Sequence, residues 1–271
     1  MRYGLAAWGL REESLESQLA LTKKLGLELL EFSIANYDKD ALQLGATDAQ
    51  IEHVKELFRQ NGIRLECGCT GNDFTGDDVA EQVKKVKEVV DIAEKLGLRY
   101  LRIFAGFNSD SVVIGERLVK MLAALKEVND YAKNTGVRLC VETHGGVACL
   151  ENGALVHFNS ATTRTDIWKE IVKTGVSCAY DPANLTAVGT TCATGFFRQF
   201  KEAVAYVHLK DFRDVEGGVR PAACGEGRLD WKRLMETLKE FDGPAMIEYE
   251  LPEDVEDGMT RSLNFLKAHE A

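Results

Sequence analysis

Four apolar segments in the second half of the chain each carry, at or near their end, a side chain that could bind a metal ion or move a proton. These residues are Glu142, Asp181, His208 and Glu248, in the strings LCVETH, CAYDP, YVHLK and MIEYE. If the segments are parallel strands, their carboxyl ends meet at one edge, so the four side chains converge. Three desolvated carboxylates repel one another and would be forced to take up protons. A divalent cation between them resolves that conflict, so the pattern predicts a metal site.

The residue types in this group decide which ions they could bind. Three carboxylates and one imidazole suit Mn²⁺, Co²⁺, Mg²⁺ or Zn²⁺, and the donor atoms alone do not choose among these ions. Each residue by itself is weak evidence, because a glutamate at a strand end is usually solvated and a single histidine is usually structural. One such residue on each of four consecutive segments is the pattern that predicts one divalent ion.

Neighbouring polar residues are candidates for binding a substrate at the same place. Side chains two residues apart share a face of a strand, so His144 lies on the same strand face as Glu142, and Lys210 lies on the same strand face as His208. Asn184 follows Asp181 by three residues, where it could hold substrate, orient a ligand or cap a helix. Further candidates, weighed against ordinary surface charge or core packing, are Arg102, Arg213, Arg220, Glu66 and Trp8.

The elements that must position these residues follow a repeating pattern. An amphipathic helix ends in a glycine, usually with a basic residue just before it, and an apolar strand begins at once. With the segments 3–8 and 205–209, the junctions give eight strands. A (β/α)8 barrel, or TIM barrel, is therefore predicted, with residues 1–271 as a single α/β domain. The junction glycines are Gly26, Gly62, Gly97, Gly136, Gly175 and Gly243.

Three stretches are longer than a short connecting loop. They span residues 68–78, 145–165 and 211–228, and each follows a predicted strand and precedes a predicted helix. In a barrel, such stretches lie at the carboxyl-terminal face of the strands, where long loops build the binding site. We therefore expect the active site at that face.

The composition limits the classes of function. The formal net charge of -10 and the pI of about 5.1 argue against nucleic acid as a partner. No apolar run reaches the roughly 20 residues of a membrane span, and the chain begins with a strand rather than a leader. The seven cysteines lack metal-ligand spacing and are typical of reduced thiols. These features predict a soluble, cytoplasmic protein with no membrane partner.

Beyond these physical patterns, the strings LCVETHGG, YDPANL, VHLKD, AMIEYE and CGEGRLDW resemble those of the xylose isomerase-like TIM-barrel superfamily. The resemblance is to its sugar isomerase and epimerase branch, which includes tagatose-type ketose 3-epimerases, hydroxypyruvate isomerase and inosose dehydratase. It implies that Glu142, Asp181, His208 and Glu248 bind one divalent metal ion and that the two glutamates act as acid and base. It also implies a homo-oligomer, either a dimer or a tetramer.

Two departures from the superfamily's patterns bear on the substrate. A histidine frequent three residues after the aspartate is Asn184 here. The DNA-repair endonuclease branch uses a histidine-rich cluster of several metals, whereas this chain has only five histidines. The second departure disfavours a DNA substrate, and the first leaves the identity of a small sugar or polyol-derived substrate open.

The leading hypothesis is a divalent-metal-dependent sugar isomerase or epimerase of carbohydrate metabolism. The ion would hold the carbonyl and adjacent hydroxyl of an open-chain sugar and stabilise an enediolate. One glutamate would remove the proton next to the carbonyl, and the other would return it. Alternatively, the same site could dehydrate a keto-inositol, a keto-sugar or a dehydroshikimate-like acid, or the barrel could bind a sugar without turnover. Substrate stereochemistry, phosphorylation and the native metal stay open.

Overall fold

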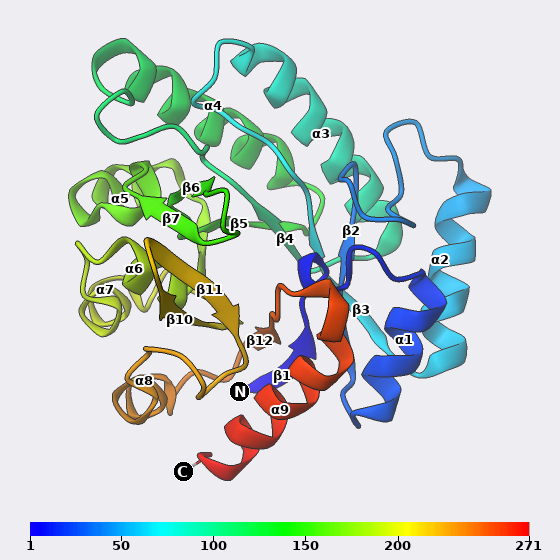
Figure 1. Cartoon of the computed structure of the whole chain (residues 1–271). Helices are drawn as coiled ribbons and strands as arrows, with labels where there is room; N and C mark the ends of the chain where they lie inside the picture. Colours follow the sequence, from blue (N-terminus) through cyan, green and yellow to red (C-terminus); the bar gives the residue numbers. More distant parts are fainter. Residues whose placement is uncertain (271) are drawn as a thin grey trace.

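Eight parallel strands close into a barrel with helices around it in the computed structural model, which describes residues 1–270 (Figure 1). The order around the barrel is β1-β12-β9-β8-β5-β4-β3-β2, so the predicted eight-stranded barrel is confirmed. That the whole chain is one domain stays a prediction. The barrel strands are β1 (Arg2–Leu5), β2 (Leu29–Ser33), β3 (Arg64–Cys69), β4 (Tyr100–Ile103), β5 (Arg138–Glu142), β8 (Ser177–Tyr180), β9 (Val204–Leu209) and β12 (Pro244–Ile247).

The helices bury apolar faces against the outside of the barrel. The helix that begins at Asp48 shows why the sequence folds this way, because a capping box between Thr47 and Gln50 closes its start and left-handed Gly62 closes its end. All the predicted junction glycines except Gly243 have positive φ. The α-helices are α1 (Leu15–Lys24), α2 (Asp48–Asn61), α3 (Val79–Leu96), α4 (Gly115–Ala132), α5 (Thr165–Ile171), α6 (Pro182–Val188), α7 (Ala193–Phe200), α8 (Trp231–Leu238) and α9 (Val255–Ala268), with 3-10 turns η1 (Trp8–Leu10), η2 (Ala161–Thr163), η3 (Val172–Thr174) and η4 (Pro252–Asp254).

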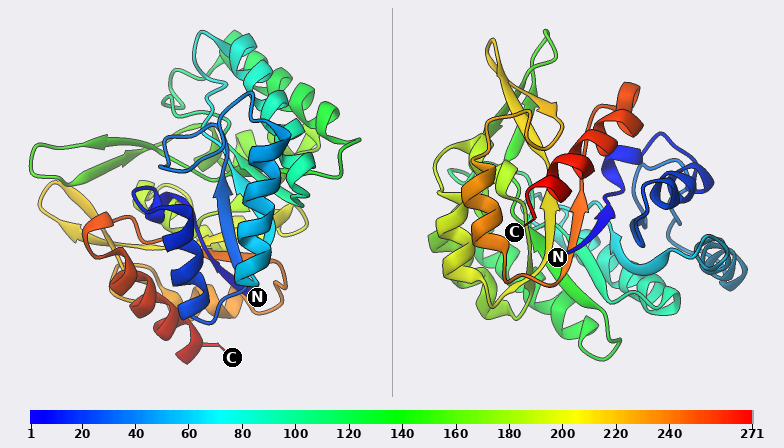
Figure 2. Two further views of the ribbon diagram at one scale, coloured as in Figure 1. Left: turned by 90° about the vertical axis from the view of Figure 1, so that its right-hand side faces the viewer. Right: turned by 90° about the horizontal axis from the view of Figure 1, so that it is seen from below.

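Two of the three stretches expected to be loops form β-hairpins instead. β6 (Gly146–Cys149) pairs with β7 (Leu155–Phe158), and β10 (Asp211–Val215) pairs with β11 (Gly218–Ala222), all antiparallel. A contact between Val219 and Leu155 joins the hairpins into one four-stranded sheet. Figure 2 shows the two hairpins projecting together from the barrel. They follow β5 and β9, so they extend the strands that carry Glu142 and His208.

Inside the barrel, an apolar layer lies one step below a polar layer. Because alternate residues of a strand share a face, moving two residues toward the carboxyl end leads from the first layer to the second. The apolar layer contains Leu29, Tyr100, Cys140, Ala179, Tyr206 and Met246, and the polar layer contains Glu31, Arg102, Glu142, Asp181, His208 and Glu248.

The connection that follows the second hairpin is fixed by one buried carboxylate. Asp211 accepts hydrogen bonds from the backbone amides of Gly225 at 3.2 Å, Gly227 at 3.0 Å and Leu229 at 3.2 Å, and from the indole of Trp231 at 2.6 Å. A Cβ on Gly227 would lie 2.1 Å from that carboxylate, so only glycine fits there. The string CGEGRLDW therefore encodes an anchored loop at the edge of the site.

The seven cysteines are free thiols, five of them buried, within the described residues. None of the helices in residues 1–270 combines the length and the apolar character that crossing a bilayer demands.

Candidate metal centre

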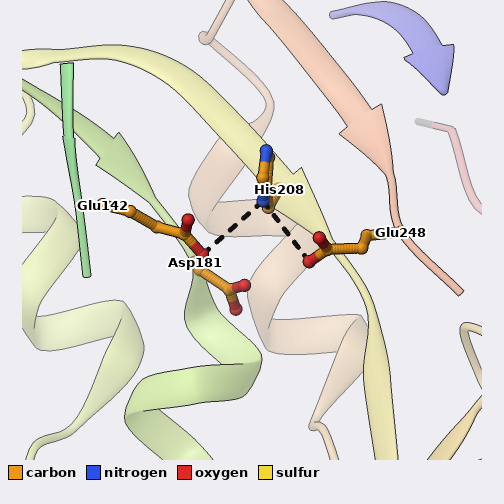
Figure 3. A group of neighbouring side chains, drawn as sticks. All are labelled: Glu142, Asp181, His208 and Glu248. Atoms are coloured by element: carbon orange, nitrogen blue, oxygen red, sulfur yellow. Dashed lines mark ion pairs between the residues drawn. The ribbon is translucent and has the colours of Figure 1, made fainter. Parts of the chain in front are cut away.

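The four predicted ligands lie together at the carboxyl ends of neighbouring strands β5, β8, β9 and β12 (Figure 3). One ligand atom from each of Glu142, Asp181, His208 and Glu248 lies within 4.8 Å of the others. All four residues are buried, with exposures of 3%, 0%, 0% and 4%. Glu142 and Glu248 reach toward His208 from opposite sides in Figure 3. The structure thus brings the predicted set together.

The imidazole of His208 presents a different nitrogen to each side of the barrel interior. Its Nδ1 lies 3.6 Å from Glu142 Oε1 and 3.4 Å from Glu248 Oε2. Its Nε2 lies 3.5 Å from Glu31 Oε1. Burial disfavours the charged form of His208, but the nearby carboxylates of Glu248 and Glu142 favour that form more strongly. The pKa of His208 is therefore raised well above its usual range. Nδ1 is the nitrogen that faces the carboxylates of Glu142 and Glu248.

Lys210 compensates charge on the mouth side of this cluster. Its Nζ lies 3.2 Å from Asp181 Oδ2, 2.8 Å from Glu248 Oε2 and 2.7 Å from Glu250 Oε1. Burial raises the pKa of Asp181 to about 7 against the opposing effect of this ammonium. Lys210 itself is 3% exposed, so these ion pairs are screened little by solvent.

The side-chain amide of Asn184 bridges two of the candidate ligands, Glu142 and Asp181. Its Nδ2 donates to Asp181 Oδ2 at 3.0 Å and lies 3.2 Å from both Glu142 Oε1 and the carbonyl of Thr143. Asp181 Oδ1 in turn accepts the backbone amide of Asn184 at 2.9 Å and so caps α6. The amide therefore holds the carboxylates of Glu142 and Asp181 in place relative to each other.

Below the ligands, Glu31 and Arg102 form a buried ion pair that sequence reasoning did not identify as a unit. Arg102 Nε lies 3.5 Å from Glu31 Oε1 and 3.4 Å from Glu142 Oε2. Burial would raise the pKa of Glu31, but Arg102 and His208 outweigh it and lower that pKa to about 2. A lone carboxylate in the apolar run LLEFSI was the signal that could have revealed Glu31, because alternation places it inside the barrel.

The donor atoms and the charge balance of the cluster both fit a divalent cation. Neither ring nitrogen of His208 has a hydrogen-bond partner among residues 1–270. With a neutral imidazole, the buried carboxylates and the buried cations leave two negative charges uncompensated. One divalent ion would neutralise them and use the imidazole nitrogen. The carboxylates are Glu31, Glu142, Asp181 and Glu248, and the cations are Arg102 and Lys210.

Of the remaining candidates, His144 lies at the mouth, whereas Arg213 and Glu66 do not join the cluster. The ring of His144 packs edge-on against Phe104 and Phe107 at 5.3 and 5.4 Å, and burial lowers its pKa. Arg213 is exposed on β10. Glu66 pairs with Arg2 at 2.9 Å, near the start of β1 and thus at the opposite end of the barrel. It comes too early on β3 to reach the mouth.

Arg220 lies in the hairpin sheet, and Trp8 lies just beyond the carboxyl-terminal end of β1. Arg220, on β11, donates to the backbone carbonyl of Asn152 within the hairpin sheet. Trp8 is 37% exposed, and the guanidinium of Arg11 lies 4.6 Å from its ring centre, so it is not the core residue that the sequence favoured.

Comparison with known proteins agrees with this architecture. A family model described as "Xylose isomerase-like TIM barrel" matches residues 19–269. The protein IolI with a bound zinc atom superposes with a TM-score of 0.77 at 19% identity, covering 99% of this chain and 98% of that one. The probable 3-DHS dehydratase AsbF of Bacillus anthracis gives 0.75 at 13%, covering 98% and 99%. D-allulose 3-epimerase from Methylomonas sp. gives 0.72 at 15%, covering 99% and 98%.

These structural likenesses establish the fold, whereas the family match establishes descent. A search among curated proteins finds no match. The family match covers most of the chain and includes all four clustered residues. The resemblance noted in the sequence is confirmed: this chain belongs to the xylose isomerase-like TIM-barrel family.

Proposed function

We propose that the protein is a divalent-metal-dependent isomerase or epimerase of small open-chain sugars or polyol-derived substrates. The observation that supports this most is the placement of two buried glutamates, Glu142 and Glu248, on opposite sides of His208. Glu142, Asp181, His208 and Glu248 would hold the ion, with Mn²⁺, Co²⁺, Mg²⁺ and Zn²⁺ as candidates. Bound there, it would supply Lewis-acid polarisation of a substrate carbonyl.

The two glutamates move the proton in this proposal. Isomerisation and epimerisation both require a base on one side of the reacting carbon and an acid that returns the proton to a neighbouring carbon or the opposite face. Glu142 is fixed from inside the barrel by Arg102 at 3.4 Å, and Glu248 from the mouth by Lys210 at 2.8 Å. Each carboxylate is thus held in one orientation, which proton transfer over a short distance demands.

Substrate recognition is assigned to residues at the mouth. His144 and Lys210 lie on strand ends beside the ligands, and Asn184 orients the ligands themselves. The hairpin sheet adds His157, whose ring lies 4.9 Å from that of Phe212 and whose Nδ1 has no hydrogen-bond partner among residues 1–270. Arg213 is exposed on the same sheet and would contact only a substrate that extends from the clustered residues to the hairpins.

Lys210 is the observation that favours a second candidate, dehydration of a keto-inositol, keto-sugar or related acid. An elimination begins with the same proton abstraction but then expels a hydroxyl group, whose developing negative charge needs stabilisation. A buried ammonium within 3.2 Å of two candidate ligands can supply it. Simple isomerisation has no leaving group and no such need.

Turnover in D₂O distinguishes these reactions. The metal-loaded protein is incubated with a panel of ketoses, aldoses and cyclitol ketones, and products are examined by mass spectrometry. An isomerase gives an isomeric product whose mass differs from that of the substrate only by incorporated solvent deuterium, whereas a dehydratase gives a product lighter by one water. Binding of a panel sugar without any turnover would instead support a non-catalytic barrel and contradict the proposal.

The Glu248→Gln variant ties the activity to the site. Loss of a positioned acid–base group lowers turnover by about 10²–10⁴-fold. Glu66→Gln is the matched control, because Glu66 is also a barrel-strand carboxylate but pairs with Arg2 away from the ligands. Equal activity in both variants would contradict the assignment.

A further inference from the structure

Glu31 contacts the nitrogen of His208 that points away from the other carboxylates. Glu31 Oε1 lies 3.5 Å from Nε2, while Nδ1 faces Glu142 and Glu248. A histidine that binds a metal through Nδ1 must carry its proton on Nε2. The carboxylate of Glu31 makes an ionic contact with Nε2 rather than a hydrogen bond, and its negative charge favours the tautomer with the proton on that nitrogen.

Glu31 is itself held on both carboxylate oxygens. Its Oε2 accepts the backbone amide of Ala7 at 3.1 Å, and its Oε1 accepts the hydroxyl of Tyr206. The side chain is fully buried, so it has no room to exchange these partners for solvent. Tyr206 precedes His208 by two residues on β9, and the two rings meet edge-on at 5.2 Å. The carboxylate beside Nε2 is therefore rigid.

The same carboxylate reaches a second candidate ligand through Arg102. The guanidinium Nε lies between Glu31 Oε1 at 3.5 Å and Glu142 Oε2 at 3.4 Å. A plain structural explanation is that Glu31 only neutralises Arg102. That explanation does not account for the contact between Glu31 and His208. It also does not explain why an ion pair is buried here at all, because removing the charges from water costs free energy and an apolar pair of similar volume would pack as well.

We propose that Glu31 is a positioning residue of the metal site. It orients His208 with Nδ1 toward Glu142 and Glu248, and through Arg102 it fixes the carboxylate of Glu142. The inference rests on the metal site of the proposed function and extends it to a residue outside the ligand set. It concerns ion binding, so it holds whichever reaction the site performs.

Co²⁺ binding by the full-length, metal-free protein tests this role. Affinity is measured by competition with a chromophoric chelator, and the visible absorption of the bound ion reports its coordination geometry. For Glu31→Gln we expect affinity to fall by about 10- to 100-fold, as for other residues that orient metal ligands, with a changed cobalt spectrum. Glu66→Gln, a strand carboxylate paired with Arg2, should match the wild type in both.

The outcomes of this experiment distinguish a failure of the metal site itself from a failure of the positioning role of Glu31. If the wild-type protein does not bind Co²⁺, the metal site itself is contradicted, and the role of Glu31 falls with it. If the wild type binds and Glu31→Gln has the same affinity and spectrum, only the positioning role is overturned.

A second variant covers the case in which Glu31→Gln does not fold. Tyr206→Phe removes only the hydroxyl that donates to Glu31, and the loss of about one hydrogen bond predicts roughly fivefold weaker Co²⁺ binding. In the Zn²⁺-loaded protein, ¹⁵N resonances of His208 should show a protonated Nε2. Wild-type affinity in Tyr206→Phe, or a protonated Nδ1, would overturn the inference.

Discussion

Replacing Lys210 with methionine removes the buried cation on the mouth side of the cluster while keeping a side chain of similar length. Lys210 is 3% exposed and pairs with Asp181, Glu248 and Glu250 at 3.2, 2.8 and 2.7 Å. Deleting one partner of a buried ion pair costs about 3–5 kcal/mol, because the other charges are left uncompensated. At roughly 2.1 cal/mol/K of unfolding entropy per residue, 271 residues convert that loss into a fall of about 5–9 °C in Tm.

The effect should depend on metal. Without Lys210, the four carboxylates in the interior have only Arg102 and His208 as cationic neighbours, so a divalent ion has more charge to neutralise. An ion and an ammonium a few ångströms apart also repel by several kcal/mol at an effective dielectric of about 20. We therefore expect Lys210→Met to bind the ion more tightly than the wild type and to regain much of its lost Tm when metal is added.

Thermal unfolding followed by circular dichroism, with and without Co²⁺, measures both effects. Lys126→Met is the control, because Lys126 pairs with Asp130 on α4 with 62% of its side chain exposed, and such exposed pairs contribute little. The reasoning is refuted if metal-free Lys210→Met melts at the same temperature as Lys126→Met, or if added metal stabilises the wild type more than Lys210→Met.

Two further predictions concern the loops around the mouth. Burial, with Lys210 and His144 nearby, lowers the pKa of His157 from the usual 6.5 to about 3. As pH falls, the unfolded chain therefore takes up a proton at this histidine before the folded protein does. The stability that the neutral His157 contributes is complete above pH 6.5 and is lost as pH falls from 6.5 through 3. Urea unfolding at pH 7 and pH 4.5 should therefore show a smaller acid loss in His157→Gln than in the wild type, and an equal loss would contradict the assignment. Asp211→Ala leaves the backbone amides of Gly225 and Gly227 without their acceptor, and we expect about 3 kcal/mol of destabilisation and faster amide exchange there; unchanged exchange would show that the loop does not need this anchor.

The barrel was predictable because it repeats. Each helix end with a left-handed glycine marks a strand start, and positive φ at Gly26, Gly62, Gly97, Gly136 and Gly175 confirms those local signals. The hairpins were not predictable in the same way. Their strands are four or five residues long, and a single pairing between Val219 and Leu155 links them. Such short strands form through tertiary contact rather than through local preference.

The candidate site was predictable for the residues at the carboxyl ends of the strands and less so for the other candidates. Their positions at the carboxyl ends of parallel strands predicted that Glu142, Asp181, His208 and Glu248 converge, and the structure brings them together. Arg102 was predicted to bind substrate, and this stays a prediction; in the structure its Nε lies 3.5 Å from Glu31 Oε1 and 3.4 Å from Glu142 Oε2. Glu66 comes early on β3 and pairs with Arg2 at 2.9 Å, away from the four clustered residues.

The metal content of the protein purified without chelator tests the central claim most directly. Elemental analysis should find about one divalent ion per chain in the wild type and in Glu66→Gln, and much less in folded Glu248→Gln and His208→Ala. That result would place the ion among Glu142, Asp181, His208 and Glu248. Equal metal content in all four proteins, or none in the wild type even after dialysis against Co²⁺, Mn²⁺ and Zn²⁺, would contradict it.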